Sequence, residues 1–257
     1  MFLSAGSHVL ACFPKQAKRH RPGLDFNLHG IGKKMAIVKE VILGSGSVFR
    51  KNLLASSGLI FNSKPSPIDE KSITDPSPKI LAEKRSIAKA QALSAQHPES
   101  LIIGADQTLS LDGKLFEKVS NRAEAKKCLK SLSGKTYYLH SGFCLVYQKN
   151  CDTNSHLLHA EVVDTPLALR QLSEPEIEAY LDTKEWEGVV GCNRIEGVGI
   201  HLHDASYPLN THTIIGLPLA QLLESFRKVG INSLTKPKPP WEIKLDSTKL
   251  PLKHSKV

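Results

Sequence analysis

Hydrophobic positions between residues 35 and 230 alternate between the two-residue period of strands and the longer period of helices. An apolar run over residues 38–45 predicts a strand, and the Gly-Ser-Gly-Ser segment at its end predicts a tight turn. The apolar spacing that follows predicts a helix over residues 48–57, which ends at Gly58. The patterned part of the chain therefore begins as strand, turn and helix.

A proline-rich loop over residues 64–78 separates this unit from an Ala- and Lys-rich stretch. The apolar spacing of that stretch predicts a long helix up to His97. The next apolar run, residues 101–111, predicts a strand, and the Asp-Gly step after it predicts a hairpin turn into residues 114–117.

The rest of the chain continues this mixture. Asn121 and Glu124 predict a capping box for a helix that ends at Gly134. Interleaved strands and helices with a hairpin predict an α/β fold, with a mixed twisted sheet flanked by helices. Further strands are predicted over residues 137–147, 157–169 and 195–202, and further helices over residues 173–181 and 219–226.

The composition describes a chain able to fold without a membrane. With 257 residues and 40% hydrophobic content it can bury a large core, and no stretch approaches the roughly 18 apolar residues of a membrane helix. The five cysteines are an odd number without a C-x-x-C pair, so the sequence suggests neither a disulfide framework nor a zinc cluster. We expect a cytoplasmic protein.

The net charge of +9 lies at the two ends of the chain. Residues 1–34 hold six Lys or Arg and one Asp, residues 231–257 hold six Lys and two acidic residues, and residues 35–230 are neutral. A domain that binds a nucleic-acid backbone should carry its charge on the folded part, so we expect no stable nucleic-acid partner. We predict one folded domain over residues 35–230, between a basic N-terminal extension and a basic Pro- and Lys-rich C-terminal tail over residues 231–257, both of them poorly structured.

The N-terminal extension has two targeting alternatives. Its Leu-Ala-Cys segment at Cys12 resembles a lipoprotein cleavage site, but no Lys or Arg precedes it, which argues against export. A basic, acid-poor transit segment is the other alternative. We favour neither, and we predict that translation starts at Met35 or that residues 1–34 are dispensable.

Residues 44–51, Gly-Ser-Gly-Ser-Val-Phe-Arg-Lys, place a glycine-rich turn at the predicted start of a helix. Free backbone amides, two hydroxyls and two cations favour an anion there. The segment matches neither the Walker P-loop nor G-x-G-x-x-G, because Phe49 stands at the last glycine position. A tight connection without a ligand is the structural alternative.

A carboxylate and an amide, Asp106 and Gln107, interrupt a predicted apolar strand. A buried acid must be paired, lie near a metal or stand at the edge of a cleft, and a structural ion pair is the alternative to a functional role. Glu70, Lys89 and Lys118 supply further charges, and each of them alone is most often a solvated side chain.

His201 and His203 fall on one face of a predicted strand with His212 nearby, which is the spacing of a metal pair. A metal site needs a further ligand, so we predict solvent-facing histidines instead. The glycines beside Glu196 indicate either a strand bulge or a close approach of a ligand to the backbone.

Taken together, these segments resemble the Maf family of nucleoside triphosphate pyrophosphatases over about residues 37–230. The resemblance implies a mixed α/β fold with two lobes around a nucleotide cleft, a divalent cation (Mg²⁺ or Mn²⁺) and a homodimer. It also implies hydrolysis of the α–β phosphoanhydride to a nucleoside monophosphate and pyrophosphate. The segments that carry it include VILGSGSVFRKNLLASSGL, PIDE, LIIGADQTLSLDGKLFEK, LSEPEIEAYL, RIEGVGI and TIIGLPLAQLLESFR.

The resemblance also implies roles for individual residues. A triphosphate carries about four negative charges, which cations, amides and a metal must offset while water attacks the α-phosphorus. An Asp beside that water can accept its proton. The implied residues are Asp106 as general base, Arg50, Lys89 and Lys118 as catalytic cations, Ser45 and Ser47 in the phosphate-binding loop, and Glu70 with Asp106 as metal ligands.

Three positions separate the branches of this family, and here they hold Phe49, Gln107 and Glu196. An aromatic residue, Gln and Glu resemble the branch that acts on 7-methyl-GTP, whereas the dTTP/UTP branch typically has Arg, Thr and Gln. The loop departs from the common Ser-Pro-Arg-Arg, and Val119 follows Lys118 where Pro is usual. We predict a 7-methyl-GTP pyrophosphatase; the alternatives are a dTTP/UTP pyrophosphatase and a non-catalytic inhibitor of septum formation.

Overall fold

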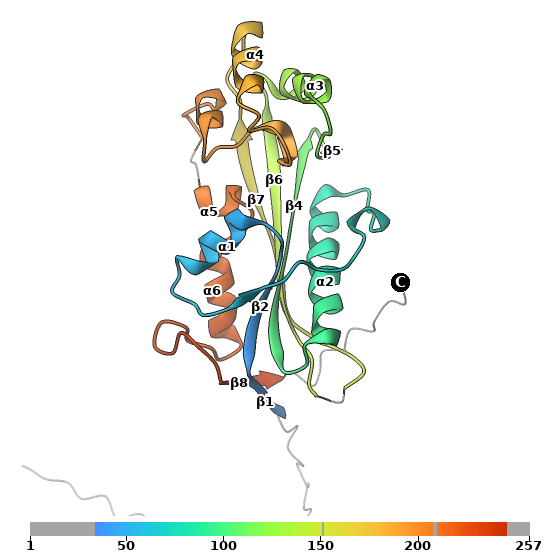
Figure 1. The fold of residues 1–257 in the computed structure, drawn as a ribbon, viewed down its shortest axis with the longest axis vertical. Helices are drawn as coiled ribbons and strands as arrows, with labels where there is room; N and C mark the ends of the chain where they lie inside the picture. Colours follow the sequence, from blue (N-terminus) through green and yellow to red (C-terminus); the bar gives the residue numbers. More distant parts are fainter. Residues whose placement is uncertain (1–33, 151, 208–209, 246–257) are drawn as a thin grey trace, which may run out of the picture. The chain divides into compact units, whose positions relative to one another are not determined.

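Three long strands form the centre of the fold: β4 (Ser100–Leu111), β6 (Thr136–Tyr147) and β7 (His156–Ala168) (Figure 1). The computed structural model describes residues 34–150, 152–207 and 210–245. β2 (Glu40–Gly44) pairs in parallel with β3 (Asn62–Ser63) and with β4, whereas the β4–β6 and β6–β7 pairs are antiparallel. β5 (Lys114–Phe116) returns antiparallel on β4 through the predicted hairpin. The predicted mixed sheet is confirmed.

Helices cover both faces of this sheet (Figure 1). The long helix α2 lies on one face, α1 and α6 lie on the other, and α3 and α4 lie at the far end of the long strands. The helices are α1 (Val48–Ala55), α2 (Pro78–Gln96), α3 (Arg122–Leu132), α4 (Glu174–Asp182), α5 (Thr211–Ile214) and α6 (Leu219–Lys228), with 3₁₀ turns at Glu70–Ser72, Val190–Cys192 and Val198–Leu202.

Side chains before the first turn fix where several helices begin. The Ser47 hydroxyl accepts a hydrogen bond from the backbone N–H of Arg50, which satisfies one free amide of α1. At α3 the predicted capping box is only half formed. Asn121 accepts from the N–H of Glu124, but the Glu124 carboxylate accepts from the N–H of Ser120 instead of that of Asn121.

Helix α2 packs unusually close to the sheet because glycines face it. A Cβ atom added at Gly104 would lie 2.1 Å from the carbonyl oxygen of Ser86, and one at Gly142 would lie 2.7 Å from the carbonyl oxygen of Ala82. Neither position can therefore hold a larger residue without moving the helix. These two contacts fix the distance between α2 and the sheet.

Two large hydrophobic cores lie along the long strands and give the predicted two lobes. The first core packs α1 and α6 against the sheet, with Phe143, Tyr147 and Phe226 fully buried. The second packs α3 and α4 against the other half of the strands, around Tyr137, Leu129 and Leu181. A smaller cluster lies under α2.

The expectation of a poorly structured tail over residues 231–257 is wrong for its central part. Trp241–Leu245 form β8, which pairs antiparallel with β1 (Lys34–Val38). Trp241 and Ile243 are buried, because the alternating Trp-x-Ile-x-Leu pattern gives the strand one apolar face that joins the first core. The fold therefore extends to Leu245, while residues 1–33 and 246–257 lie outside the described part of the chain.

The predicted strand over residues 195–202 is also wrong, because this segment forms turns and a 3₁₀ helix. The Glu185 carboxylate accepts a hydrogen bond from the N–H of Gly199 at 3.3 Å. A Cβ atom at Gly197 would lie 2.4 Å from the same carboxylate. The glycines thus let the backbone fold around Glu185 instead of extending.

The prediction of solvent-facing histidines is wrong for His203, which is buried. Its Nε2 lies 2.9 Å from Oδ1 of Asn193, and burial lowers the pKa of His203 to about 4. Asn193 donates its amide to Gly191, so its Oδ1 accepts from a neutral His203. His203 is a structural residue of the second lobe, whereas His201 is exposed.

Two further observations concern the composition. No helix in residues 34–150, 152–207 and 210–245 is both long and apolar enough to cross a membrane. Cys128, Cys144 and Cys192 are buried free thiols, while Cys12 and Cys151 lie outside the described residues.

Candidate active site

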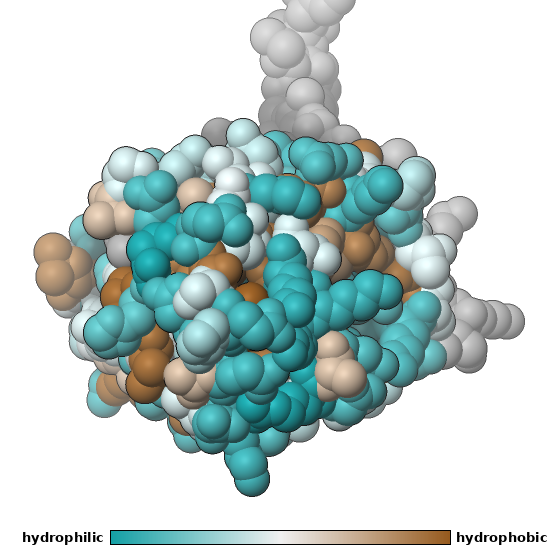
Figure 2. All heavy atoms as spheres, turned by 90° about the horizontal axis from the view of Figure 1, so that it is seen from above, coloured by the Kyte–Doolittle hydropathy of each residue, from teal (hydrophilic) through white to brown (hydrophobic). Residues whose placement is uncertain are grey.

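A cleft of about 750 Å³ opens between the two lobes, a volume suited to a nucleotide. Polar and charged residues line its centre. Seen from the end of the molecule where α3 and α4 lie, the surface is mostly hydrophilic with apolar residues exposed in places (Figure 2). The structure brings every residue of the site that the family resemblance implied to this one cleft. They are Ser45, Ser47, Phe49, Arg50, Glu70, Lys89, Asp106, Gln107, Lys118 and Glu196.

Two carboxylates and a lysine form the centre of the cleft, called here the carboxylate–lysine centre (Glu70, Lys89 and Asp106). The Lys89 ammonium of α2 lies 2.6 Å from Oδ1 of Asp106 on β4 and 2.8 Å from Oε1 of Glu70. The close packing of α2 at Gly104 brings the two partners together. Lys89 and Asp106 are buried, so their charges interact more strongly than they would in water.

Glu70 begins the 3₁₀ turn that follows the proline-rich loop. Burial is the largest single effect and raises the pKa of its carboxyl, but the hydrogen bond and the charge of the Lys89 ammonium, added to those of neighbouring cations, hold the pKa below its ordinary value. The charges of Lys118 and Arg85 act in the same direction. Glu70 is therefore a carboxylate at neutral pH, despite its place in the cleft.

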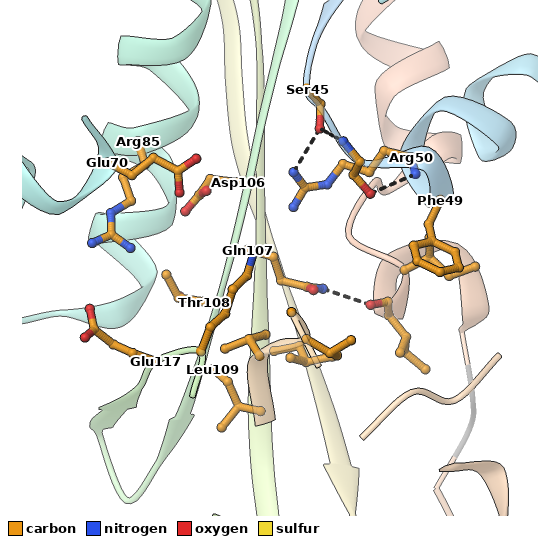
Figure 3. A pocket seen from close by; sticks show the side chains of 18 of the residues that line it. Ser45, Phe49, Arg50, Glu70, Arg85, Asp106, Gln107, Thr108, Leu109 and Glu117 are labelled. Carbon is orange, nitrogen blue, oxygen red and sulfur yellow. Dashed lines mark hydrogen bonds between the residues drawn. The ribbon is translucent and has the colours of Figure 1, made fainter. Parts of the chain in front are cut away.

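The phosphate loop, residues 44–50, carries a half-buried cation, Arg50, that forms no ion pair with a carboxylate among the described residues. The Arg50 guanidinium donates to the carbonyl oxygens of Gly216 (2.9 Å) and Ala105 (3.2 Å), and lies 3.4 Å from the Ser45 hydroxyl (Figure 3). Burial lowers the pKa of Arg50, whereas the nearby carboxylates raise it. The guanidinium is thus fixed beside the start of α1, and the N-terminal end of a helix favours an anion.

An aromatic ring, an amide, a guanidinium and a carboxylate also line the cleft, and they are called here the Phe49 end (Phe49, Gln107, Arg194 and Glu196). Phe49 is 40% exposed, and the Arg194 guanidinium carbon lies 5.0 Å from the centre of its ring. The Gln107 amide nitrogen donates to Ser141 and to backbone carbonyls of α5. Its carbonyl oxygen binds no other described residue, so Gln107 offers the cleft an acceptor.

Two arginines of the cleft, Arg85 and Arg194, were not anticipated from the sequence. Arg85 stands four residues before Lys89 on α2, a spacing that places both on one helix face and was the available signal. Arg194 follows Asn193 in an irregular segment, so no periodicity could have placed it. The remaining predicted cation, Lys118, lines the cleft and is exposed.

Comparison with known proteins tests the family resemblance directly. The family model described as "Maf-like protein" matches residues 40–229, which is most of the chain. The chain belongs to the Maf family. This Maf protein shares 38% identity over 197 residues with a Rhodopseudomonas palustris protein named nucleoside triphosphate pyrophosphatase, covering 74% of this chain and 94% of that protein.

Other Maf relatives carry a more specific name. Proteins named 7-methyl-GTP pyrophosphatase match at 34% identity in Cupriavidus pinatubonensis and at 36% in Rhizobium etli, each over 74% of this chain and at least 93% of the relative. A solved HAM1 protein from Coxiella burnetii aligns over 74% of this chain and 98% of its own, at 17% identity and a TM-score of 0.40. The Maf chain is an enzyme of the acid-anhydride hydrolases, as its curated relatives are.

Proposed function

We propose that this Maf protein hydrolyses 7-methyl-GTP to 7-methyl-GMP and pyrophosphate. The observation that carries the reaction is the carboxylate–lysine centre beside the phosphate loop, where Lys89 contacts Asp106 at 2.6 Å and Glu70 at 2.8 Å. The observation that carries the substrate is the chemistry of the Phe49 end. Relatives under both names, nucleoside triphosphate pyrophosphatase and 7-methyl-GTP pyrophosphatase, are compatible with the proposal.

In this reaction, Asp106 accepts a proton from the water that attacks the α-phosphorus. Lys89 binds Oδ1 of Asp106, whereas Oδ2 is buried without a hydrogen-bond partner among the described residues. The second oxygen is therefore available to a ligand of the cleft. The Arg50 guanidinium and the amides at the start of α1 would stabilise the charge that develops on the phosphate oxygens.

The two carboxylates also fit the divalent cation that the family resemblance implies. Mg²⁺ is commonly held by one or two carboxylates together with substrate phosphates and water. Within the described ranges no cluster of three or more His, Cys, Asp or Glu could hold a metal alone, so Glu70 and Asp106 would share it with the substrate. When bound, Mg²⁺ or Mn²⁺ would neutralise phosphate charge.

The Phe49 end suits a methylated guanine. The 7-methylguanine ring is cationic, so an aromatic face and the Glu196 carboxylate can attract it by cation–π and Coulombic interactions that a neutral pyrimidine lacks. Guanine also presents two adjacent N–H donors, which the carboxylate and the Gln107 carbonyl oxygen can accept. A thymine or uracil ring offers one such donor.

A substrate panel tests this proposal. Pyrophosphate and inorganic phosphate release would be measured for 7-methyl-GTP, GTP, dTTP and UTP, with Mg²⁺ and with Mn²⁺. We expect pyrophosphate release and the highest kcat/KM for 7-methyl-GTP. A higher value for dTTP or UTP would overturn the substrate assignment and leave the pyrophosphatase assignment standing, whereas no pyrophosphate from any nucleotide would overturn both.

A further inference from the structure

Arg85 is a cation of the cleft that the reaction described above does not use. It lies on α2, one turn before Lys89, and lines the same cleft. Its Nη2 donates to the carbonyl oxygen of Ile73 at 3.3 Å. Its Nε is buried and has no hydrogen-bond partner within residues 34–150, 152–207 and 210–245.

A buried guanidinium N–H without a hydrogen-bond partner is unfavourable, because that N–H loses water without gaining a replacement. No ion pair to Arg85 occurs in the described ranges, although it is close enough to Glu70 to lower the pKa of that carboxyl. Lys89 is different, because two carboxylates already neutralise it. Arg85 thus retains an uncompensated charge that an anion in the cleft could use.

The position of Arg85 indicates which anionic part of a nucleotide it would contact. Figure 3 shows Arg85 and Glu70 on one side of Asp106, while Phe49 and Arg50 lie on the other side. A nucleotide with its base at Phe49 and its α-phosphate at Asp106 would place its outer phosphates toward Arg85. Lys118, which also acts on Glu70, lies in the same part of the cleft.

We propose that Arg85 binds the β- and γ-phosphates and holds the pyrophosphate as it leaves; this inference rests on the proposed function. Water adds to the α-phosphorus, the bond from that phosphorus to the bridging oxygen breaks, and the electron pair remains on the β-phosphate. The planar guanidinium can donate two parallel hydrogen bonds to phosphate oxygens. It thereby offsets the charge that the leaving group gains.

The test uses inhibition of the full-length enzyme by its two products. Inhibition constants for pyrophosphate and for 7-methyl-GMP would be measured for the unmodified protein, Arg85→Gln and Arg85→Lys. Lys84→Gln is the matched control, because Lys84 is the neighbouring cation on α2 but pairs with Asp75 at 2.6 Å outside the cleft. Thermal melting would check that each variant is folded.

We expect Arg85→Gln to raise the pyrophosphate constant about 10- to 100-fold, as loss of charge-assisted hydrogen bonds implies, and to change the 7-methyl-GMP constant less than about twofold. The pyrophosphate constant of Arg85→Lys should lie between those of the unmodified protein and Arg85→Gln. Lys84→Gln should change neither inhibition constant. An unchanged pyrophosphate constant in Arg85→Gln, or an equal change for both products, would overturn the inference.

A failure of the proposed function can be distinguished from a failure of the inference about Arg85. If the unmodified protein releases no pyrophosphate from any nucleotide, direct calorimetric binding of pyrophosphate with Mg²⁺ to the same four proteins replaces inhibition. Weaker binding only in the Arg85 variants would still support an anion site at Arg85. Equal binding by all four proteins would overturn it.

Discussion

At the carboxylate–lysine centre, the side chains of Lys89 and Asp106 are 8% and 6% exposed and bind each other, whereas at the Phe49 end the aromatic ring is 40% exposed. The first pair stands on a long helix and a long strand, held in register by glycine contacts. The second set comes from the first turn of α1, from the irregular segment around Glu196 and, for Gln107 alone, from β4.

In the proposed function, this difference separates the residues of the reaction from those of base selection. Groups that must meet a phosphate with fixed geometry stand on regular elements, where packing limits their movement. Apart from Gln107, the groups assigned to the base stand on exposed segments, where a substitution changes a contact without disturbing a core. We therefore expect substitutions at the centre to lower turnover of every nucleotide, and those at the Phe49 end to change preference among nucleotides.

The largest effect is expected from Asp106→Asn, which keeps the shape of the side chain but removes the proton acceptor. The kcat should fall about 10²- to 10⁴-fold for every nucleotide, as loss of a general base typically causes. Steady-state kinetics would measure kcat, and circular dichroism would show whether the variant is folded. Asp182→Asn, an exposed residue at the end of α4, is the control. Near-normal kcat in folded Asp106→Asn would refute the role of Asp106.

Gly104→Ala should act on the same centre through packing. Its Cβ would lie 2.1 Å from the Ser86 carbonyl oxygen, so α2 must shift and carry Lys89 away from Asp106. We expect a loss of about 1–3 kcal/mol in the free energy of unfolding, together with lower kcat. Urea denaturation would measure the first. Gly113→Ala is the control, because a Cβ atom at Gly113 would have no heavy atom within 4 Å; with a φ of +74° at that position, the variant should be less stable but keep its specific activity. An unchanged free energy of unfolding in Gly104→Ala would contradict the close packing of α2 on β4.

Glu196→Gln should change the preference of the enzyme more than its residual activity. Removing the carboxylate charge should lower the ratio of kcat/KM for 7-methyl-GTP to that for dTTP by roughly 10- to 200-fold, the usual value of one discriminating contact. Competition assays with both nucleotides would measure the ratio. Glu178→Gln, an exposed residue of α4, should leave it unchanged. Equal losses for both nucleotides would assign Glu196 to the reaction instead of to selection.

The smallest effect is expected from Arg194→Ala. The Arg194 guanidinium lies 5.0 Å from the Phe49 ring centre, and a cationic base would compete with it for that ring. Exposed cation–π contacts are worth about 0.5–1 kcal/mol, so the same kcat/KM ratio should rise roughly two- to fivefold. A fall in the ratio would show that Arg194 assists the base instead of competing with it.

The sequence predicts the regular elements well, because caps, a hairpin step and helical spacing are local signals. It fails where distant residues decide the structure. Trp241 is buried because β8 pairs with β1, a strand about 200 residues earlier in the chain. The glycine-rich turns near Glu196 depend on a hydrogen bond to the carboxylate of Glu185. Lys and Pro around Trp241 suggested an unfolded tail, since composition does not show a pairing partner.

The candidate site shows the same division. Family resemblance brought ten residues together, and the structure places all of them in one cleft. It could not show that Arg50 is bound by backbone carbonyls, that Gln107 presents an acceptor, or that Arg85 keeps an unpaired N–H. These properties depend on hydrogen bonds between elements far apart in the chain.

Hydrolysis of 7-methyl-GTP in H₂¹⁸O tests the account of the carboxylate–lysine centre most directly, because the label records which phosphorus water attacks. Attack at the α-phosphorus, as the proposed role of Asp106 requires, would place ¹⁸O in 7-methyl-GMP and none in pyrophosphate. Mass spectrometry of the two products would show which of them carries the label. Label in pyrophosphate, or release of inorganic phosphate as the first product, would contradict the assignment of Asp106 to the α-phosphorus.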